Sequence, residues 1–371
     1  MKQKLVYSFF SFLLIVTIVA ACSKTDATST SDGDGSSSDN YSDSAVNPDP
    51  IDVTTCADAT GIDKIICLAD AFKAQLSSSQ LASVQLDYSV SNAEKWSNFP
   101  EAIYRQRIGL NFGSMTKTQI QYAKALLKEV AGTTDNEGWD ELQQLLNADQ
   151  YLNANGGGND YGAANYYIAF LGAPSATGTF EIQFGGHHTA FANTYENGVL
   201  VGATPSFRGV EPFETFTWHD KSNQPVQQEQ AALSAMLTGL SSTELSSAKL
   251  SGTFGDLVAG PQEDGQFPST QSGIPCSGLT SDQKTLVLNA IKTYVDDVAD
   301  SAAIITKYTS ELDNTYISYS GSTGLTTRND YVRIDGPSVW IEYSCQGGVI
   351  LQGTHPHSVW RDKKTDYGGN L

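Results

Sequence analysis

The sequence predicts an α+β fold, with helices packed on one or more antiparallel sheets in a single domain of residues 52–371. Stretches with the apolar spacing of helices form two blocks, and strand-like stretches joined by turn residues follow each block. Helices grouped before strands are typical of this class. Hydrophobic residues make up 40% of the chain, which is enough for a buried core.

The first block contains three helices and then a run of strands. Apolar side chains recur at helical spacing over 63–77, 116–132 and 137–152. Strand patterns follow over 165–172 and 178–207. A hairpin turn is predicted at "ENG", because asparagine and glycine adopt positive φ at low cost.

The second block has the same order. Helices are predicted over 227–240, over 241–250 and from 280 to about 300, and strands over 315–322, 329–345 and 348–361. "MTKTQIQYAKALLKEV" in the first block is echoed by "LTSDQKTLVLNAIKTYV" in the second. This echo favours two repeated helix-then-strand halves within one domain, each reaching a histidine pair. A chance likeness between two similar hairpins is the alternative.

Residues 1–51 are predicted to lie outside the domain. Residues 1–21 have two lysines before an apolar run, as in a secretory signal peptide. The ending "VAAC" resembles the lipobox of bacterial lipoproteins, which implies cleavage before Cys22 and a lipid on its sulfur. A plain signal peptide with a chance cysteine is the alternative. Residues 22–51 are expected to be a disordered tether, because their few apolar side chains cannot offset the entropy of ordering.

These features predict a lipid-anchored protein of a bacterial cell envelope. The outer membrane is favoured, because Ser23 is not the aspartate that marks inner-membrane retention. The formal net charge of −19, without a lysine and arginine cluster, excludes nucleic acid as a partner. A membrane is therefore the expected partner through the lipid. A small molecule or glycan is a further candidate, and the oligomeric state is left open.

Four cysteines remain beyond Cys22, and an even number favours disulfides in an exported protein. Cys56 and Cys67 are close in sequence and are predicted to be bridged. Cys276 and Cys345 are either a second pair or free buried thiols. The sequence has no CxxC spacing, so it gives no support for a thiolate zinc or redox site.

Four of the five histidines fall in two short strand-like stretches, "FGGHHTAF" and "THPHSVWR". Because side chains alternate along a strand, His355 and His357 should point the same way. His187 and His188 should point opposite ways, so that one of them joins the first pair. Three imidazoles are the ligand set of an open zinc or copper site, which predicts a metal centre. A histidine-lined site for an organic ligand or for acid–base chemistry, and purely structural roles, are the alternatives.

Four charged residues are candidate catalytic groups: Arg208, Glu342, Arg361 and Asp362. Arg361 is expected either to clamp a carboxylate or phosphate, or to pair with Asp362. Arg208 should either reach the histidines or pair with Glu211. Glu342 lies on an apolar strand, where a buried carboxylate needs a partner. That partner is expected to be a histidine, a metal or Arg333. The ring N–H groups of metal-bound histidines also need acceptors, for which Asp362, Asp366 and Glu342 are the candidates.

The stretches "FGGHHTAF", "TPSFRGVEP", "GPSVWIEYSCQGG" and "HPHSVWRDKKTDYGG" resemble the bacterial domain-of-unknown-function family 3500 over roughly residues 60–371. The resemblance implies a shared fold and a site at these motifs, and it implies no activity. The histidines favour a metal-dependent envelope enzyme, hydrolytic or oxidative. A lipid-anchored binding protein for a small ligand or glycan, without a metal, is the alternative, and a structural lipoprotein is a third reading.

Overall fold

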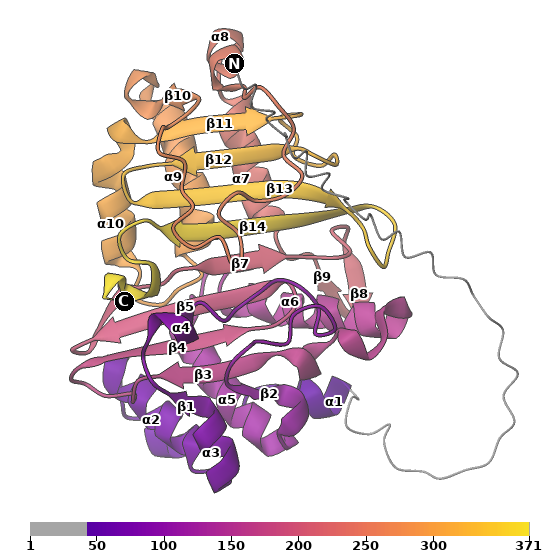
Figure 1. Cartoon of the computed structure of the whole chain (residues 1–371), viewed down its shortest axis with the longest axis vertical. Coiled ribbons are helices and arrows are strands. Elements are labelled where there is room, and N and C mark those ends of the chain that lie inside the picture. Colours follow the sequence, from indigo (N-terminus) through magenta and orange to yellow (C-terminus); the bar gives the residue numbers. More distant parts are fainter. Residues whose placement is uncertain (1–42, 371) are drawn as a thin grey trace, which may run out of the picture. The chain divides into compact units, whose positions relative to one another are not determined.

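Two strands from distant parts of the sequence, residues 206–209 and 354–362, pair at the centre of one large sheet (Figure 1). The computed structural model describes residues 43–370. The order along the sheet is β1 (Gln85–Leu86), β3 (Tyr167–Leu171), β4 (Thr179–Gly185), β5 (Thr189–Glu196), β7 (Ser206–Gly209), β14 (Thr354–Asp362), β13 (Val339–Gly347), β12 (Tyr331–Asp335), β11 (Tyr316–Ser320) and β10 (Ile274–Pro275). Two further strands, β2 (Leu110–Asn111) and β6 (Val199–Gly202), pair with β3 and β5.

Neighbouring strands of this sheet are antiparallel, except that β1 runs parallel to β3. The predicted "ENG" turn joins β5 to β6, and Asn197 and Gly198 both have positive φ there. A separate hairpin is formed by β8 (Phe216–Trp218) and β9 (Lys221–Asn223). The predicted α+β class is therefore confirmed.

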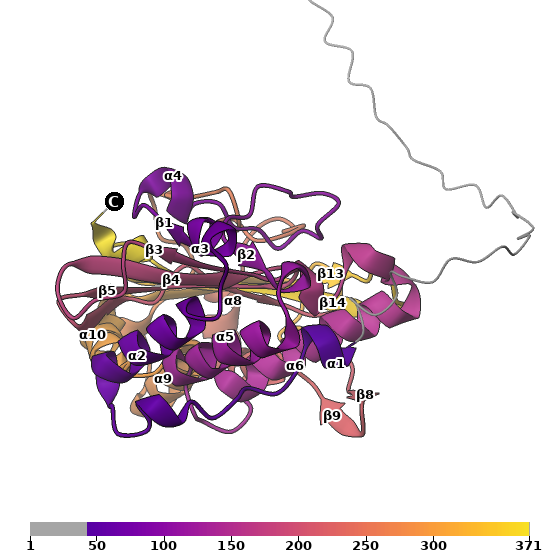
Figure 2. The ribbon, with the colours of Figure 1, turned by 90° about the horizontal axis from the view of Figure 1, so that it is seen from below.

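The larger helices cover one face of the sheet (Figure 2). The helices are α1 (Asp43–Val46), α2 (Gly61–Lys73), α3 (Ser78–Val84), α4 (Val90–Ala93), α5 (Lys117–Val130), α6 (Trp139–Leu152), α7 (Gln227–Thr238), α8 (Ser242–Ala248), α9 (Ser281–Val295) and α10 (Ala302–Glu311). Two apolar clusters fill the space under them. One joins α2 and α5 to β3 and β4, and the other joins α7 and α9 to β11, β12 and β13. None of the described helices has the length and apolar content needed to cross a bilayer.

The opposite face is covered by α4 and by two long segments with little regular structure, 94–109 and 250–273 (Figure 2). Trp96 from the first segment packs against Phe207 of β7. The backbone N–H groups of Val258 and Ala259 in the second donate to Glu342 of β13. These segments lack strand partners, so side chains satisfy part of their backbone. They bury the face of β5, β7 and β14 that carries the histidines.

The elements occur in the same order in both parts of the chain. Helices α5 and α9 each begin with a capping box, Thr116 with Gln119 and Thr280 with Gln283. Each helix follows a short strand and precedes a second helix and three antiparallel strands. The histidines do not follow this order, because the turn 336–338, which matches the turn that carries His187 and His188, contains no histidine. Internal duplication stays a prediction.

The predicted signal peptide, Cys22 and most of the predicted tether lie outside the described residues. The end of that tether differs from the expectation. Residues 43–46 form α1, and the side chain of Val46 is buried. The backbone N–H of Ile51 donates to the carbonyl of Gln121 in α5. The folded unit therefore begins before residue 52, because these residues contact the helical layer.

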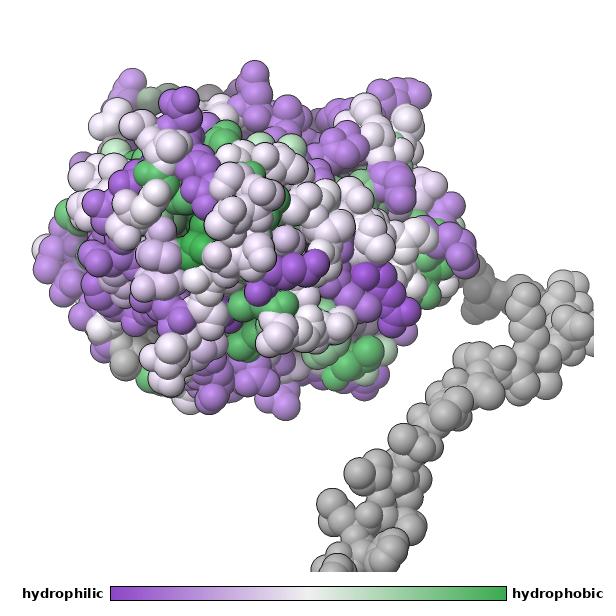
Figure 3. All heavy atoms as spheres, turned by 90° about the horizontal axis from the view of Figure 1, so that it is seen from above, coloured by the Kyte–Doolittle hydropathy of each residue, from purple (hydrophilic) through white to green (hydrophobic). Residues whose placement is uncertain are grey.

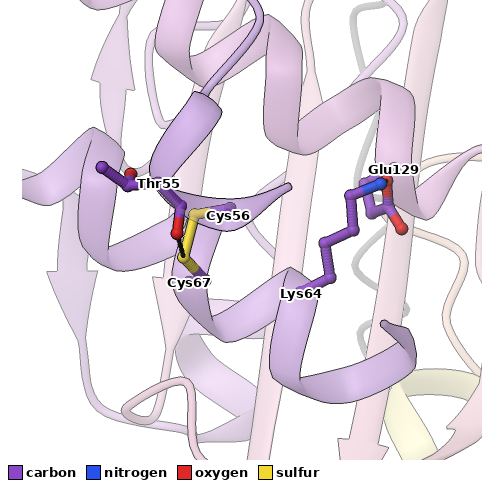
Figure 4. Close-up of a disulfide and its surroundings, with 5 residues drawn as sticks. All are labelled: Thr55, Cys56, Lys64, Cys67 and Glu129. Carbon is purple, nitrogen blue, oxygen red and sulfur yellow. Dashed lines mark hydrogen bonds and ion pairs between the residues drawn. A yellow bond between two sulfur atoms is a disulfide. The ribbon is translucent and has the colours of Figure 1, made fainter. Parts of the chain in front are cut away.

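Cys56 and Cys67 form the predicted disulfide, with Cα atoms 5.8 Å apart (Figure 4). It ties the segment before α2 to the helix itself. Nearby, Lys64 of α2 pairs with Glu129 of α5 at 2.9 Å. Cys276 and Cys345 are free thiols in the core, so the second pair is not formed.

Candidate metal centre

Three imidazole rings converge on one point beneath the surface. The Nε2 atom of His355 lies 3.0 Å from Nε2 of His188 and 2.8 Å from Nε2 of His357. One nitrogen from each ring lies within 4.8 Å of the others. Each of the three residues is 5% exposed. The predicted meeting of His355 and His357 with one residue of the other pair is therefore observed.

His355 and His357 lie on the same face of β14, as strand alternation predicts. In the pairing of β14 with β7, His357 stands opposite Gly209. A Cβ atom on Gly209 would lie 3.0 Å from Cδ2 of both His188 and His357. Glycine at this position therefore leaves the room in which the two rings meet.

His188 reaches the cluster from the turn between β4 and β5, not from a strand, so alternation does not apply to it. Its φ of 64° belongs to the left-handed region that a residue in a tight turn adopts. The rings of His187 and His188 are stacked with centroids 3.6 Å apart, so they do not point opposite ways. His187 instead contacts Asp149 of α6 through Nδ1 at 2.6 Å. A Cβ atom on the preceding Gly186 would run into the ring of Tyr166.

The outer nitrogens of two rings fix where their hydrogens lie. Nδ1 of His355 contacts the carbonyl oxygen of Gly347 at 3.2 Å, and Nδ1 of His357 contacts the carboxylate of Asp256 at 3.0 Å. Both oxygens accept hydrogen bonds, so both Nδ1 atoms must carry the hydrogen. In the neutral rings, the two Nε2 atoms then hold lone pairs that face each other at 2.8 Å. A cation between them removes this repulsion.

Burial favours the neutral form of the His188 and His355 rings. It lowers the pKa of His188 well below the ordinary histidine value, and the neighbouring histidines lower it further. Burial, followed by the electrostatic influence of the neighbouring His357, lowers the pKa of His355 to about 3. Neutral imidazole is the form that binds a transition metal. His188 and His355 are therefore in the form that binds zinc or copper at neutral pH.

On a tetrahedral ion, the three histidines would leave one coordination position open. Structural zinc sites have four protein ligands, whereas catalytic sites have three and a water or substrate. Among residues 43–370, no cysteine, aspartate or glutamate joins the three histidines as a further ligand. Asp256 binds the outer side of His357, and its side chain is 50% exposed. It therefore orients a ligand at the rim of the site, as carboxylates do beside metal-bound histidines.

Glu342 lies away from this cluster. Its carboxylate accepts hydrogen bonds from the backbone of Val258 and Ala259, from the Tyr331 hydroxyl and from the Trp340 indole. The expected partners, a histidine, a metal or Arg333, are replaced by these four donors. The guanidinium of Arg333 lies over the ring of Trp340. Glu342 thus fixes the segment 250–273 onto the sheet, and it is not the acceptor expected for a histidine.

Arg361 and Asp362 do not pair with each other, because adjacent strand residues face opposite sides of the sheet. Arg361 is fully buried and pairs with Asp264 and Asp366. Asp362 accepts hydrogen bonds from the side chains of Lys307 and Tyr308 in α10. Asp362 and Asp366 are therefore engaged elsewhere. The acceptors for the histidines are Asp256, Gly347 and Asp149.

Arg208 precedes Gly209 on β7 and so points to the helical face, away from the histidines. It binds Glu141 of α6 and Asp297, and not Glu211 as one expectation had it. Glu211 accepts instead from the three backbone N–H groups of residues 349–351. It therefore holds the turn between β13 and β14, whose carbonyl at Gly347 orients His355.

The sequence alone did not reveal Asp256. It lies 101 residues before its partner His357, in a segment that carries no periodic pattern. The local stretch "FGDLVAG" gives an acidic residue beside a glycine, as many surface turns do. Only the fold shows that this turn meets β14.

Comparison with known proteins gives one match. A family model described as "Protein of unknown function (DUF3500)" matches residues 58–369. This range includes Asp256 and the four histidines at positions 187, 188, 355 and 357. No curated protein and no solved structure matches the chain.

Proposed function

Because the chain belongs to the DUF3500 family of proteins of unknown function, we propose its function from the site alone: a metal-dependent enzyme with a single zinc or copper centre. The ligands are His188, His355 and His357. One observation carries the proposal. Three Nε2 atoms meet, while Nδ1 of both β14 histidines is committed to an oxygen acceptor.

A proton is a poor substitute for the metal at this point. A proton between His355 and His357 would make an imidazolium, and burial disfavours that charged form. It would also leave the Nε2 atom of His188, 3.0 Å away, facing a second acceptor. A metal ion gives each of the three nitrogens a partner at once, at about 2.0–2.1 Å for zinc. Small outward shifts of the rings would accommodate it.

The open position supports an enzyme more than a structural site. A metal held there supplies Lewis acidity and lowers the pKa of a bound water towards neutrality. The protein residues orient and shield this position. Asp256 and Gly347 fix the rings of His357 and His355, and the stacked ring of His187 supports His188. Zinc, which has no redox chemistry of its own, would support hydrolysis, whereas copper would support oxidation by oxygen, so the identity of the metal would narrow the reaction class.

Elemental analysis of protein purified without chelator tests the proposal. We expect about one zinc or copper per chain in the wild type and none in His357→Ala. The matched control is His219→Ala, which changes a histidine in the β8–β9 turn. It should keep the wild-type metal content. If the wild type takes up neither metal after dialysis against each, or if His357→Ala takes up as much, the metal proposal fails. The metal-free binding protein then becomes the better reading.

The reaction class is tested separately on the same preparations. The zinc form is assayed with p-nitrophenyl esters and phosphates, and the copper form with catechols under oxygen. Turnover should depend on the metal and disappear in His357→Ala. Turnover that survives metal removal contradicts a metal-dependent enzyme, even where a metal binds.

We further propose that Cys22 carries a lipid and anchors the protein in a bacterial envelope, with the outer membrane favoured. The "VAAC" stretch supports the anchor, and the Cys56–Cys67 disulfide supports an oxidising compartment. Cys22→Ser should release the protein into the soluble fraction. A native protein that never incorporates labelled palmitate contradicts the anchor.

A further inference from the structure

Four buried carboxylates surround Arg208 on the helical side of the sheet. They come from Glu137, Glu141 of α6, Glu229 of α7 and Asp297, and one oxygen from each lies within 4.8 Å of the others. None of the four is more than 7% exposed. Because Arg208 precedes Gly209 on β7, this acidic cluster and the histidines lie on opposite faces of the same strand. The cluster is thus separate from the candidate metal centre.

Two of the carboxylates are fully engaged. Glu141 accepts from Nε of Arg208 at 2.7 Å and from the backbone N–H of Val226 at 2.8 Å. Asp297 accepts from the guanidinium of Arg208 and from the backbone N–H of Gly138. Arg208 therefore holds these two side chains in fixed positions and offsets part of their charge.

The other two carboxylates have oxygens without a hydrogen-bond donor. Both oxygens of Glu229 and Oε2 of Glu137 are buried and unpartnered. Oε1 of Glu229 lies 3.6 Å from Nε of Arg208, which is too far for a hydrogen bond. A buried acceptor without a donor destabilises the fold, and more so when it is charged. These oxygens point to a missing partner.

Four ionised carboxylates and one guanidinium carry a formal charge of −3, which the interior does not tolerate. Protons are one remedy, because burial and the charge of Glu141 raise the pKa of Glu137 to about 9. A protonated carboxyl, however, supplies one O–H group and leaves its second oxygen unpartnered. A divalent cation offsets two charges and contacts several oxygens together.

A cavity of roughly 40 Å³ borders the cluster, lined in part by Glu141, Arg208 and Asp297. The hydroxyl of Thr189 and the amide oxygen of Asn193 also line it, and both are buried without partners. Most of the cavity lining is apolar, so a water there would depend on these few polar groups for its hydrogen bonds. Water here can complete the shell of a cation that the carboxylates do not enclose.

We propose that Glu137, Glu141, Glu229 and Asp297 form a second metal site, which binds a calcium ion. Hard oxygen ligands select calcium or magnesium over zinc and copper. Calcium takes carboxylate oxygens at 2.3–2.6 Å, so the oxygens around one ion lie within about 5 Å of each other, and one oxygen from each of the four side chains meets this limit. Magnesium usually keeps several waters and few carboxylates. The ion joins α6 from the first part of the chain to α7 and Asp297 from the second.

Calcium titration of the full chain, after dialysis against chelator, tests this site. Isothermal calorimetry should give about one calcium per chain, and calcium should raise the midpoint of thermal unfolding. Glu229→Gln, which has the shape of a protonated carboxyl, should weaken binding at least tenfold and abolish the thermal shift. The matched control is Glu181→Gln, another buried glutamate, outside the cluster. It should bind calcium like the wild type.

His357→Ala should also bind calcium normally, so the outcome is independent of the histidine centre. If Glu229→Gln fails to fold, the wild type alone decides. A wild type whose unfolding midpoint does not move in millimolar calcium overturns the proposal and leaves protons as the neutralising species. A larger shift with magnesium than with calcium overturns the choice of ion.

Discussion

Substituting Glu181 by glutamine should make the protein more stable at alkaline pH. Glu181 lies on β4, and its side chain is fully buried. One carboxylate oxygen accepts a hydrogen bond from the hydroxyl of Thr194 at 2.9 Å, and the other has no donor. Burial raises the pKa of this carboxyl to about 8, and the hydrogen bond from Thr194 offsets only part of the shift. The native protein therefore holds Glu181 in its neutral form near pH 7.

The size of the effect follows from the two pKa values. In the unfolded chain the carboxyl ionises near 4.5, and in the native state near 8. Because the native state binds the proton more tightly, the stability from Glu181 is complete below pH 4.5. It is lost as the pH rises through 8. Each pKa unit is worth 1.36 kcal/mol, so the loss between pH 5 and pH 9 is about 4 kcal/mol. Glutamine cannot ionise and escapes this loss.

Urea unfolding of both proteins at several pH values measures the difference. At pH 5 the two should be similar, and at pH 9 Glu181→Gln should be more stable by about 4 kcal/mol. Glu263→Gln, at an exposed glutamate, is the control and should follow the wild type. Parallel stability profiles for the wild type and Glu181→Gln would refute a neutral Glu181.

Three further variants have expected outcomes. Asp256→Ala should lower the metal affinity of the histidine centre about 10–100-fold without unfolding, as measured by competitive zinc titration, because it removes the acceptor that orients His357. Gly209→Ala should cost about 1–3 kcal/mol in urea unfolding and weaken zinc binding in the same titration, since the added Cβ crowds the converging rings. The double variant Cys56→Ser with Cys67→Ser should lose about 2–3 kcal/mol of unfolding free energy relative to the oxidised protein, because the disulfide closes a short loop. Unchanged affinity or stability in any of these would contradict the corresponding contact.

Periodicity predicted the part of the site that lies on regular structure. His355 and His357 share a face of β14 because alternation along a strand is a local property of the backbone. The same rule failed for His187 and His188, because they lie in a turn where His188 has positive φ. Gly185 and Gly186, just before them, are typical of a turn, and the strand prediction over 178–207 ran through it.

Contacts between residues far apart in the sequence could not be predicted from its local patterns. The segment 250–273 has no apolar period, so nothing indicated that Asp256 would meet His357 or that Val258 and Ala259 would meet Glu342. Arg208 was expected either to reach the histidines or to pair with Glu211. It lies one residue before Gly209, and a shift of one residue moves a side chain to the other side of the sheet, so Arg208 faces the helices.

The face seen from above in Figure 3 shows apolar residues as small separate spots among polar ones. A structural lipoprotein that assembles through a broad apolar patch would look different on this face. Among the described residues, the large apolar residues with the highest exposed fractions are Val349, at 69%, and Ile103, at 68%.

The central place of β14 governs when the site can exist during synthesis. It is the last strand along the described chain, and it supplies His355 and His357 and pairs with both β7 and β13. Until it emerges, β7 and β13 each present an unpaired edge, and such edges attract other chains. A nascent protein thus passes through a stage with two open half-sheets and one of the three ligands. A metal held by the three histidines could bind only after β14 is in place, and a product that stops before residue 354 should aggregate rather than work at a reduced rate.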